Sequence, residues 1–208
     1  MGLHRQAAPL TWAVRALVVV AAMLGLGLAT STTAHASDGC RGTLEQPFLA
    51  WQDDGNYWLA PGGSFEDGAA GWDLAGGAQV VSPDLPSPGP SGQAALSIPA
   101  GGSATSAPFC VDPTARFARM FAVTSSDGSR GRDRLGVEVL PLDGSHDARW
   151  TGTLRGESAW SPTRPFRTAA PMGGWDASGQ AWMQYRFTAL GDVAWTVDDL
   201  YIDPHANH

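Results

Sequence analysis

Two adjacent carboxylates lie in the segment VAWTVDDLYIDP near the C-terminus, whose other residues are typical of a strand packed on a core. In a regular strand Trp195 and Val197 would share one face. Leu200 and Ile202 would then share the opposite face. All four can face the core only if an extra residue is inserted, which predicts a β-bulge at Asp198–Asp199. A carboxylate beside a core needs a cation or several hydrogen-bond donors. The alternative is that these acids accept hydrogen bonds from strand-edge amides or face water.

Tryptophan is the second residue type that could do chemistry, since the chain has nine. The apolar C–H face of a sugar ring can stack on an indole while nearby polar groups bind its hydroxyls. Trp150 follows polar residues on a predicted strand, and Trp160 and Trp175 lie in a long irregular region, 158–179. These three are candidates for an exposed platform, and the candidate polar partners are Arg149, Arg164, Asp176 and Gln184. The alternative is that the tryptophans are ordinary core residues.

Catalytic signatures are weak in this sequence. After residue 36 the histidines are His146, His205 and His208, and no Gly-x-Ser-x-Gly motif occurs. A glycosidase needs two facing carboxylates roughly 5–10 Å apart, whereas the aspartates here lie mostly in predicted turns. We therefore expect a non-catalytic protein, with a hydrolase of unrecognised site as an alternative.

The first 36 residues have the features of a signal peptide. Arg5 and Arg15 provide positive charge, residues 16–29 form an apolar run, and Ala34-His35-Ala36 is a small-x-small cleavage pattern. The run is shorter than the roughly 20 residues of a membrane-spanning helix. We expect cleavage after Ala36, a secreted product, and no membrane insertion once the signal is removed. Lipid attachment at Cys40 is an alternative that the preceding Ser-Asp-Gly does not favour.

The expected mature chain, 37–208, is long enough for one domain with a full core. Two of the 13 basic residues precede it, so 11 arginines against 20 acids give a net charge of −9, and lysine is absent. An acidic chain without a basic stripe argues against nucleic acid and anionic membranes as partners. Cys40 and Cys110 predict a disulfide in an oxidising compartment.

Short apolar runs separated by Gly, Pro, Ser and Asp predict an all-β chain, and no sustained helical periodicity is present. Strict alternation in 135–142 and 181–189 is typical of half-buried antiparallel strands. The predicted strands are 78–82, 94–98, 106–111, 117–124, 135–142, 148–154, 181–189 and 193–204. So many strands without helices indicate a sandwich or barrel.

Two motifs resemble those of a known family. The segment GGSFEDGAAGW, residues 62–72, resembles the first strand of secreted galactose-binding-like jelly rolls, which include many carbohydrate-binding modules. The segment WTVDDLYIDP resembles their last strand. The chain is also similar to a group of exported actinobacterial-type proteins. The resemblance covers residues 61–204 in strand layout and implies an antiparallel two-sheet jelly roll at 62–204, preceded by a flap at 37–61 and followed by a tail at 205–208.

The same resemblance implies a structural calcium. In the resembling modules a glutamate of the first strand, an aspartate of the last strand and backbone carbonyls hold it. Carried over, Glu66 and Asp198 would be ligands, with Asp199 the less favoured one. Ligation by oxygen alone suits calcium rather than zinc.

The resulting hypothesis is a secreted, non-catalytic module that binds carbohydrate of an envelope or extracellular polysaccharide. Its rival is an exported structural or protein–protein interaction domain without a sugar site. The exposure of Trp150, Trp160 and Trp175 distinguishes the two: a coplanar, exposed set would favour the first, and burial of all three the second.

Overall fold

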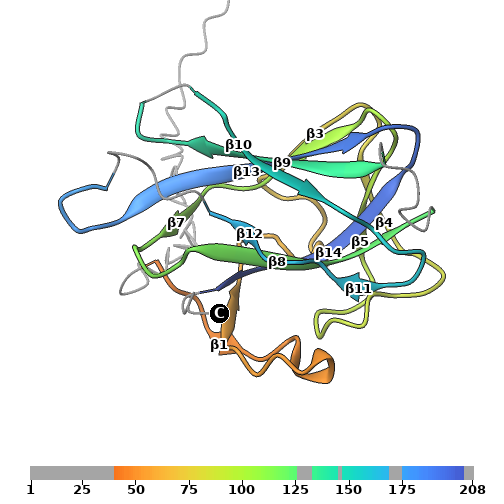
Figure 1. The fold of residues 1–208 in the computed structure, drawn as a ribbon, viewed down its shortest axis with the longest axis horizontal. Helices are drawn as coiled ribbons and strands as arrows, with labels where there is room; N and C mark the ends of the chain where they lie inside the picture. The colour runs from red at the N-terminus through yellow and green to blue at the C-terminus, as the bar shows by residue number, and fades with distance from the viewer. Residues whose placement is uncertain (1–39, 126–132, 145–146, 169–174, 204–208) are drawn as a thin grey trace, which may run out of the picture. The chain divides into compact units, whose positions relative to one another are not determined.

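The computed structural model describes residues 40–125, 133–144, 147–168 and 175–203 of the 208-residue chain (Figure 1). The chain divides into two compact units, 1–35 and 36–208, and every described residue belongs to the second. The predicted signal peptide and the tail at 205–208 lie outside the described residues, as does His146. Within the described ranges, no helix is long and apolar enough to cross a membrane.

The larger sheet is built around the C-terminal strand β14 (Trp195–Asp203). One edge of β14 pairs along most of its length with β8 (Phe117–Thr124). The other edge pairs first with β5 and then with β2. The sheet has eight strands in all. Besides β8 and β14 they are β1 (Leu44–Glu45), β2 (Tyr57–Leu59), β4 (Gln79–Val81), β5 (Ala95–Ile98), β11 (Ser161–Pro162) and β12 (Phe166–Arg167).

The smaller sheet has six strands in the order β10-β9-β13-β6-β3, with β7 also paired to β13. Its strands are β3 (Asp73–Ala75), β6 (Ser103–Thr105), β7 (Phe109–Val111), β9 (Arg134–Pro141), β10 (Arg149–Leu154) and β13 (Ala181–Leu190). All pairings in both sheets are antiparallel. Figure 1 shows the two sheets as facing layers, with β9, β10 and β13 in one and β8 and β14 in the other. The all-β, two-sheet prediction is confirmed; the described residues contain one short 3-10 turn, η1 (Leu49–Trp51).

Period-two alternation produces the core between the sheets. In β13 every second residue from Ala181 to Ala189 is buried, and the residues between them face outward. Tyr185 and Phe187 from this strand contact Phe166, with ring centroids 5.3 and 5.9 Å away. The predicted alternation thus decides which side of each sheet remains available to a ligand.

The predicted strands are largely observed, with one correction. β8 has the predicted bounds, and each of the other predicted strands overlaps an observed strand. The segment Gly62–Trp72, however, is a series of turns rather than a strand. Phe65 adopts a left-handed backbone (φ 59°), and its ring packs 4.9 Å from that of Trp72. The motif is therefore a buried aromatic turn, and it still meets the last strand, because Leu200 N donates to Gly63 O at 3.1 Å.

The N-terminal described segment packs on the outer side of the larger sheet. Phe48 and Tyr57 form a second small core with Phe121 and Tyr201. Arg119 reinforces this core, since its guanidinium lies 4.5 Å from the Phe48 ring centroid and pairs with Asp53. The predicted disulfide between Cys40 and Cys110 is present and joins the segment to β7.

Candidate functional site

The outward face of the smaller sheet carries the most exposed aromatic side chains of the two sheets. Trp150 on β10 is 55% exposed and Trp182 on β13 is 51% exposed. Trp150 lies opposite Glu138 of β9, which lies opposite Arg186 of β13, so the three form a row across the sheet. We call the surface formed by Trp150, Glu138, Arg186, Gln184 and Trp182 the outer aromatic face.

Polar groups fill the space between these two tryptophans. An Arg186 guanidinium nitrogen lies 3.7 Å from a Glu138 carboxylate oxygen, and both side chains are partly exposed. Gln184 Nε2 donates to the Ser106 carbonyl at 2.7 Å, which leaves its amide oxygen as an acceptor. The outer aromatic face therefore offers two indole faces with donors and acceptors between them.

The Trp150 ring is held in place by a glycine. A Cβ placed on Gly136 would lie 2.7 Å from Trp150 Cη2 and 2.9 Å from Cζ3, closer than real Cβ contacts. The indole thus rests directly over the Gly136 backbone, and Leu190 Cδ1 lies 3.2 Å from the same Cβ position. The absence of a side chain at Gly136 therefore allows the indole to occupy this position.

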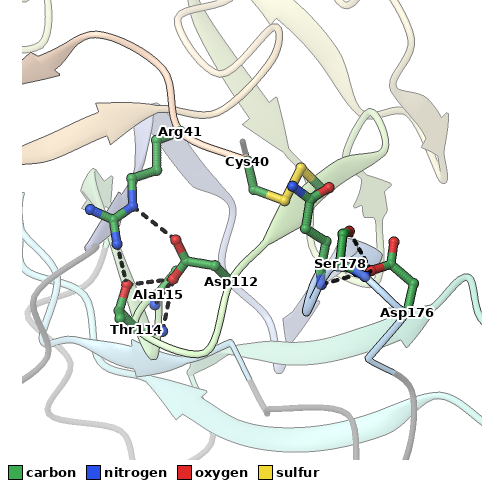
Figure 2. Close-up of a disulfide and its surroundings, with 9 residues drawn as sticks. Cys40, Arg41, Asp112, Thr114, Ala115, Asp176 and Ser178 are labelled. Carbon is green, nitrogen blue, oxygen red and sulfur yellow. Dashed lines mark hydrogen bonds and ion pairs between the residues drawn. A yellow bond between two sulfur atoms is a disulfide. The ribbon is translucent and has the colours of Figure 1, made fainter. Parts of the chain in front are cut away.

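A cleft of about 390 Å³ adjoins Trp182 at the N-terminal end of β13, and its lining also includes Trp175, Asp176 and Gln180. Asp176 Oδ1 accepts hydrogen bonds from Ser178 N at 2.8 Å and Gln180 N at 2.9 Å. The Ser178 hydroxyl also donates to it, and these bonds lower the pKa of Asp176 below its usual range. Figure 2 shows this turn in the surroundings of the Cys40 disulfide. The turn holds Asp176 ionised beside the two indoles.

The predicted ligand residues fall in three places. Trp150 and Gln184 lie on the outer aromatic face, and Trp175 and Asp176 line the adjoining cleft. Arg149 precedes Trp150 and is opposite the buried Val139, so it is directed to the other side of β10.

Trp160 and Arg164 do not belong with this set. Trp160 Nε1 donates to Leu85 O at 2.8 Å, and its ring packs against the Phe48 core on the larger sheet. Arg164 follows β11 and lines a different cleft. The three predicted tryptophans thus do not form one coplanar platform, because a distant backbone carbonyl holds Trp160. Sequence reasoning missed Trp182, Arg186 and Glu138 as site residues, although the alternation in 181–189 had placed Trp182, Gln184 and Arg186 on one face.

A second feature is the predicted bulge, which the pairing with β8 confirms. Asp198 is opposite Phe121 and Tyr201 is opposite Arg119, so Asp199 and Leu200 of β14 face the single residue Met120 of β8, one position further along than predicted. Asp199 adopts a left-handed backbone (φ 51°), and its N–H donates to Asp198 Oδ1 at 2.8 Å. We call Asp198 and Asp199 the acidic bulge.

Both carboxylates of the acidic bulge are buried, at 2% exposure for Asp198 and 0% for Asp199. Burial, reinforced by the charge of Asp199, raises the pKa of Asp198 to about 8. Burial likewise raises the pKa of Asp199 to about 6, and the nearby Ser91 opposes the rise. Neither Asp199 oxygen has a hydrogen-bond partner among the described residues. Such a group calls for a cation or a proton.

The loop that covers the acidic bulge contains glycines at its closest points. A Cβ on Gly89 would lie 1.8 Å from Asp199 Oδ2, and one on Gly92 would lie 2.6 Å from Glu66 Cδ. Glu66 Oε1 accepts a hydrogen bond from Ala94 N at 2.6 Å, and its charge raises the pKa of both aspartates. In the described part of the chain, no three His, Cys, Asp or Glu side chains are close enough to hold a metal on their own. The donors at the bulge are all oxygens and include the Ser87 and Ser91 hydroxyls, a set that fits a hard cation.

Comparison with known proteins gave structural neighbours only. No protein-family model matches the chain, and no curated protein matches it. TmCBM61 in complex with β-1,4-galactotriose is 14% identical, with a TM-score of 0.44, 69% of this chain covered and 96% of that one. The CBM22-1 xylan-binding domain of Paenibacillus barcinonensis Xyn10C is 14% identical, with a TM-score of 0.46 and coverages of 67% and 90%. The K1 cleaved adhesin domain of Lys-gingipain from Porphyromonas gingivalis is 13% identical, with a TM-score of 0.43 and coverages of 67% and 95%. At these identities the likeness concerns the fold alone.

Proposed function

We propose that this protein is a secreted, non-catalytic module that binds a polysaccharide segment across the outer aromatic face. The observation that carries the proposal is the pair of half-exposed tryptophans, Trp150 and Trp182, with the Glu138–Arg186 pair and Gln184 between them. Indole faces stack on the apolar faces of sugar rings, and carboxylate, guanidinium and amide groups bind hydroxyls. An enzyme is not needed to explain this arrangement.

The spacing of the two tryptophans favours an oligosaccharide over a single sugar. Trp150 and Trp182 lie two strands apart, and Trp182 precedes by four residues the Arg186 that shares the row of Trp150. With strands about 4.8 Å apart and a rise of about 3.3 Å per residue, their Cα atoms are roughly 16 Å apart. One sugar ring cannot contact both indoles, whereas a chain of several sugars can.

Binding to a panel of soluble polysaccharides, read by tryptophan fluorescence and calorimetry, tests this function. Trp150→Ala and Trp182→Ala should each weaken binding to the same polysaccharide, and the double variant should abolish it. Trp51→Ala is the matched control, since Trp51 is 38% exposed but packs on Phe121 of the larger sheet. If no polysaccharide binds, or if the control weakens binding as much as the two site variants, the rival interaction domain replaces this proposal.

We also propose that the acidic bulge holds a structural calcium ion. The unpartnered, buried carboxylate of Asp199 supports this, together with the nearby Asp198, Glu66 and serine hydroxyls. The ion would neutralise carboxylates that burial otherwise disfavours, and so stabilise the last strand. Calcium analysis of the purified protein and the melting temperature with and without a chelator test it. A metal-free protein whose melting temperature ignores both calcium and chelator would refute it.

Secretion is the remaining part of the proposal. The Cys40–Cys110 disulfide supports it, because such bonds persist in oxidising compartments. The native host should release the protein into its culture medium, and N-terminal sequencing should begin at Ser37. Retention inside the cell with both cysteines reduced would contradict this.

A further inference from the structure

A polar cleft of about 340 Å³ is lined by the segment that connects β10 to β11 and shares no lining residue with the outer aromatic face. It is lined by two arginines, Arg155 and Arg164, by one acid, Glu157, and by the hydroxyl residues Thr153, Ser161 and Thr163. Its lining therefore combines positive charge with hydroxyl groups.

The two arginines are exposed, and neither makes a hydrogen bond or an ion pair with another described residue. Ion pairs with aspartate or glutamate are formed instead by Arg41, Arg119 and Arg186. The guanidinium groups in the cleft are thus available to a ligand.

The backbone that carries both arginines is fixed by the core. Arg155 precedes Gly156, where a Cβ would lie 2.3 Å from Thr124 Cγ2 and 2.8 Å from Trp195 Cη2, so this turn rests directly on buried side chains. Arg164 follows Thr163, whose N–H donates to Met120 O at 2.8 Å and whose carbonyl accepts from Arg119 Nε at 2.9 Å. Anchored positions of this kind reduce the ordering that a ligand must impose.

From these features we infer that the cleft between β10 and β11 binds an anionic sugar, with Arg155 and Arg164 holding its carboxylate. The planar guanidinium matches the two oxygens of a carboxylate or phosphate, and the hydroxyl-bearing lining suits a hydroxylated ring. Glu157 lies in the same cleft and reduces its net positive charge, and the hydroxyl residues of the lining favour a carboxylate carried on a hydroxylated ring over inorganic phosphate. This inference depends on the proposed function only in taking the ligand to be a saccharide.

The test is calorimetric titration at low ionic strength with a glucuronate-containing oligosaccharide, its neutral glucose counterpart and inorganic phosphate. Arg155→Gln and Arg164→Gln should each weaken uronate binding by about tenfold, the loss of one charge-assisted bond. Glu157→Gln should strengthen it, because a competing carboxylate is removed. Arg149→Gln is the matched control with the same charge change outside the cleft, and it should leave the affinity unchanged.

The outcomes separate this site from the outer aromatic face. Uronate binding should persist in the Trp150→Ala/Trp182→Ala variant even if the polysaccharide proposal fails. Polysaccharide binding at the outer aromatic face should persist in the Arg155→Gln/Arg164→Gln variant. Equal affinity for the glucose counterpart, tighter binding of phosphate, or equal losses in the Arg149→Gln control would overturn the inference. So would an unchanged affinity in the double arginine variant, checked for folding by circular dichroism.

Discussion

Gly136→Ala should abolish most of the binding contributed by Trp150 without touching any group that contacts the ligand. The added methyl would lie 2.7 Å from Trp150 Cη2, so the ring must leave its position over the strand. The backbone at Gly136 is not left-handed, so alanine is compatible with it, and removing a glycine from a strand interior stabilises by about 0.5–1 kcal/mol. The fold should therefore survive while the platform is lost.

The expected loss of binding free energy follows from what tryptophan anchors contribute at the centre of an interface. Truncation of such an anchor costs roughly 2 kcal/mol, or about 30-fold in Kd. Gly136→Ala and Trp150→Ala should each produce a loss of this size for the best polysaccharide ligand, measured by calorimetry, with little change in melting temperature. In the double variant the two losses should not add, because both remove one ring from one position.

Two results would refute this reasoning. If Gly136→Ala binds as wild type while Trp150→Ala does not, the ring position over Gly136 is irrelevant to binding. If the losses add in the double variant, the glycine acts through something other than the ring.

The remaining predictions concern stability. In the presence of chelator, Asp199→Asn should stabilise the protein at pH 8 and have little effect near pH 4. The reason is that a raised carboxyl pKa contributes stability that is present at low pH and lost as pH rises through about 6. With calcium added the same variant should be less stable than wild type, and equal pH profiles of the two proteins would contradict the assignment. Reduction of the disulfide, which closes a loop with a sequence separation of 70, should lower the free energy of unfolding by about 4 kcal/mol, measured in urea against an untreated sample. Gly156→Ala should destabilise by about 1–3 kcal/mol through overpacking against Trp195, and a thermal melt unchanged from wild type would show that this turn can move.

The sequence predicted well those elements in which one physical signal dominates. β8, β13 and β14 are long apolar runs, and in β13 the alternation leaves one reading of which residues face the core. The bulge at Asp198–Asp199 followed from the same rule, because four apolar residues around it could be buried in no other way. The strands that were not predicted, β1, β2, β3, β6, β11 and β12, have only two or three residues each, and so short a run carries little periodicity of its own.

The candidate site was less predictable, because it depends on register and on distant contacts. Trp182 could be assigned to a face but not to a neighbour until Glu138, Arg186 and Trp150 were placed in one row. Trp160 was misjudged because its partner, the Leu85 carbonyl, is 75 residues away and has no side-chain signature. The strand that the resemblance implied at Gly62–Trp72 is absent because the left-handed conformation of Phe65 ends any strand there.

The position of β14 has a consequence for how the molecule comes into being. The strand that is synthesised last pairs with β2, β5 and β8, so the larger sheet has no centre until residue 203 is available. Contacts between the two ends of a chain are slow to form. Assembly of the larger sheet should therefore follow the synthesis of β14 rather than accompany it.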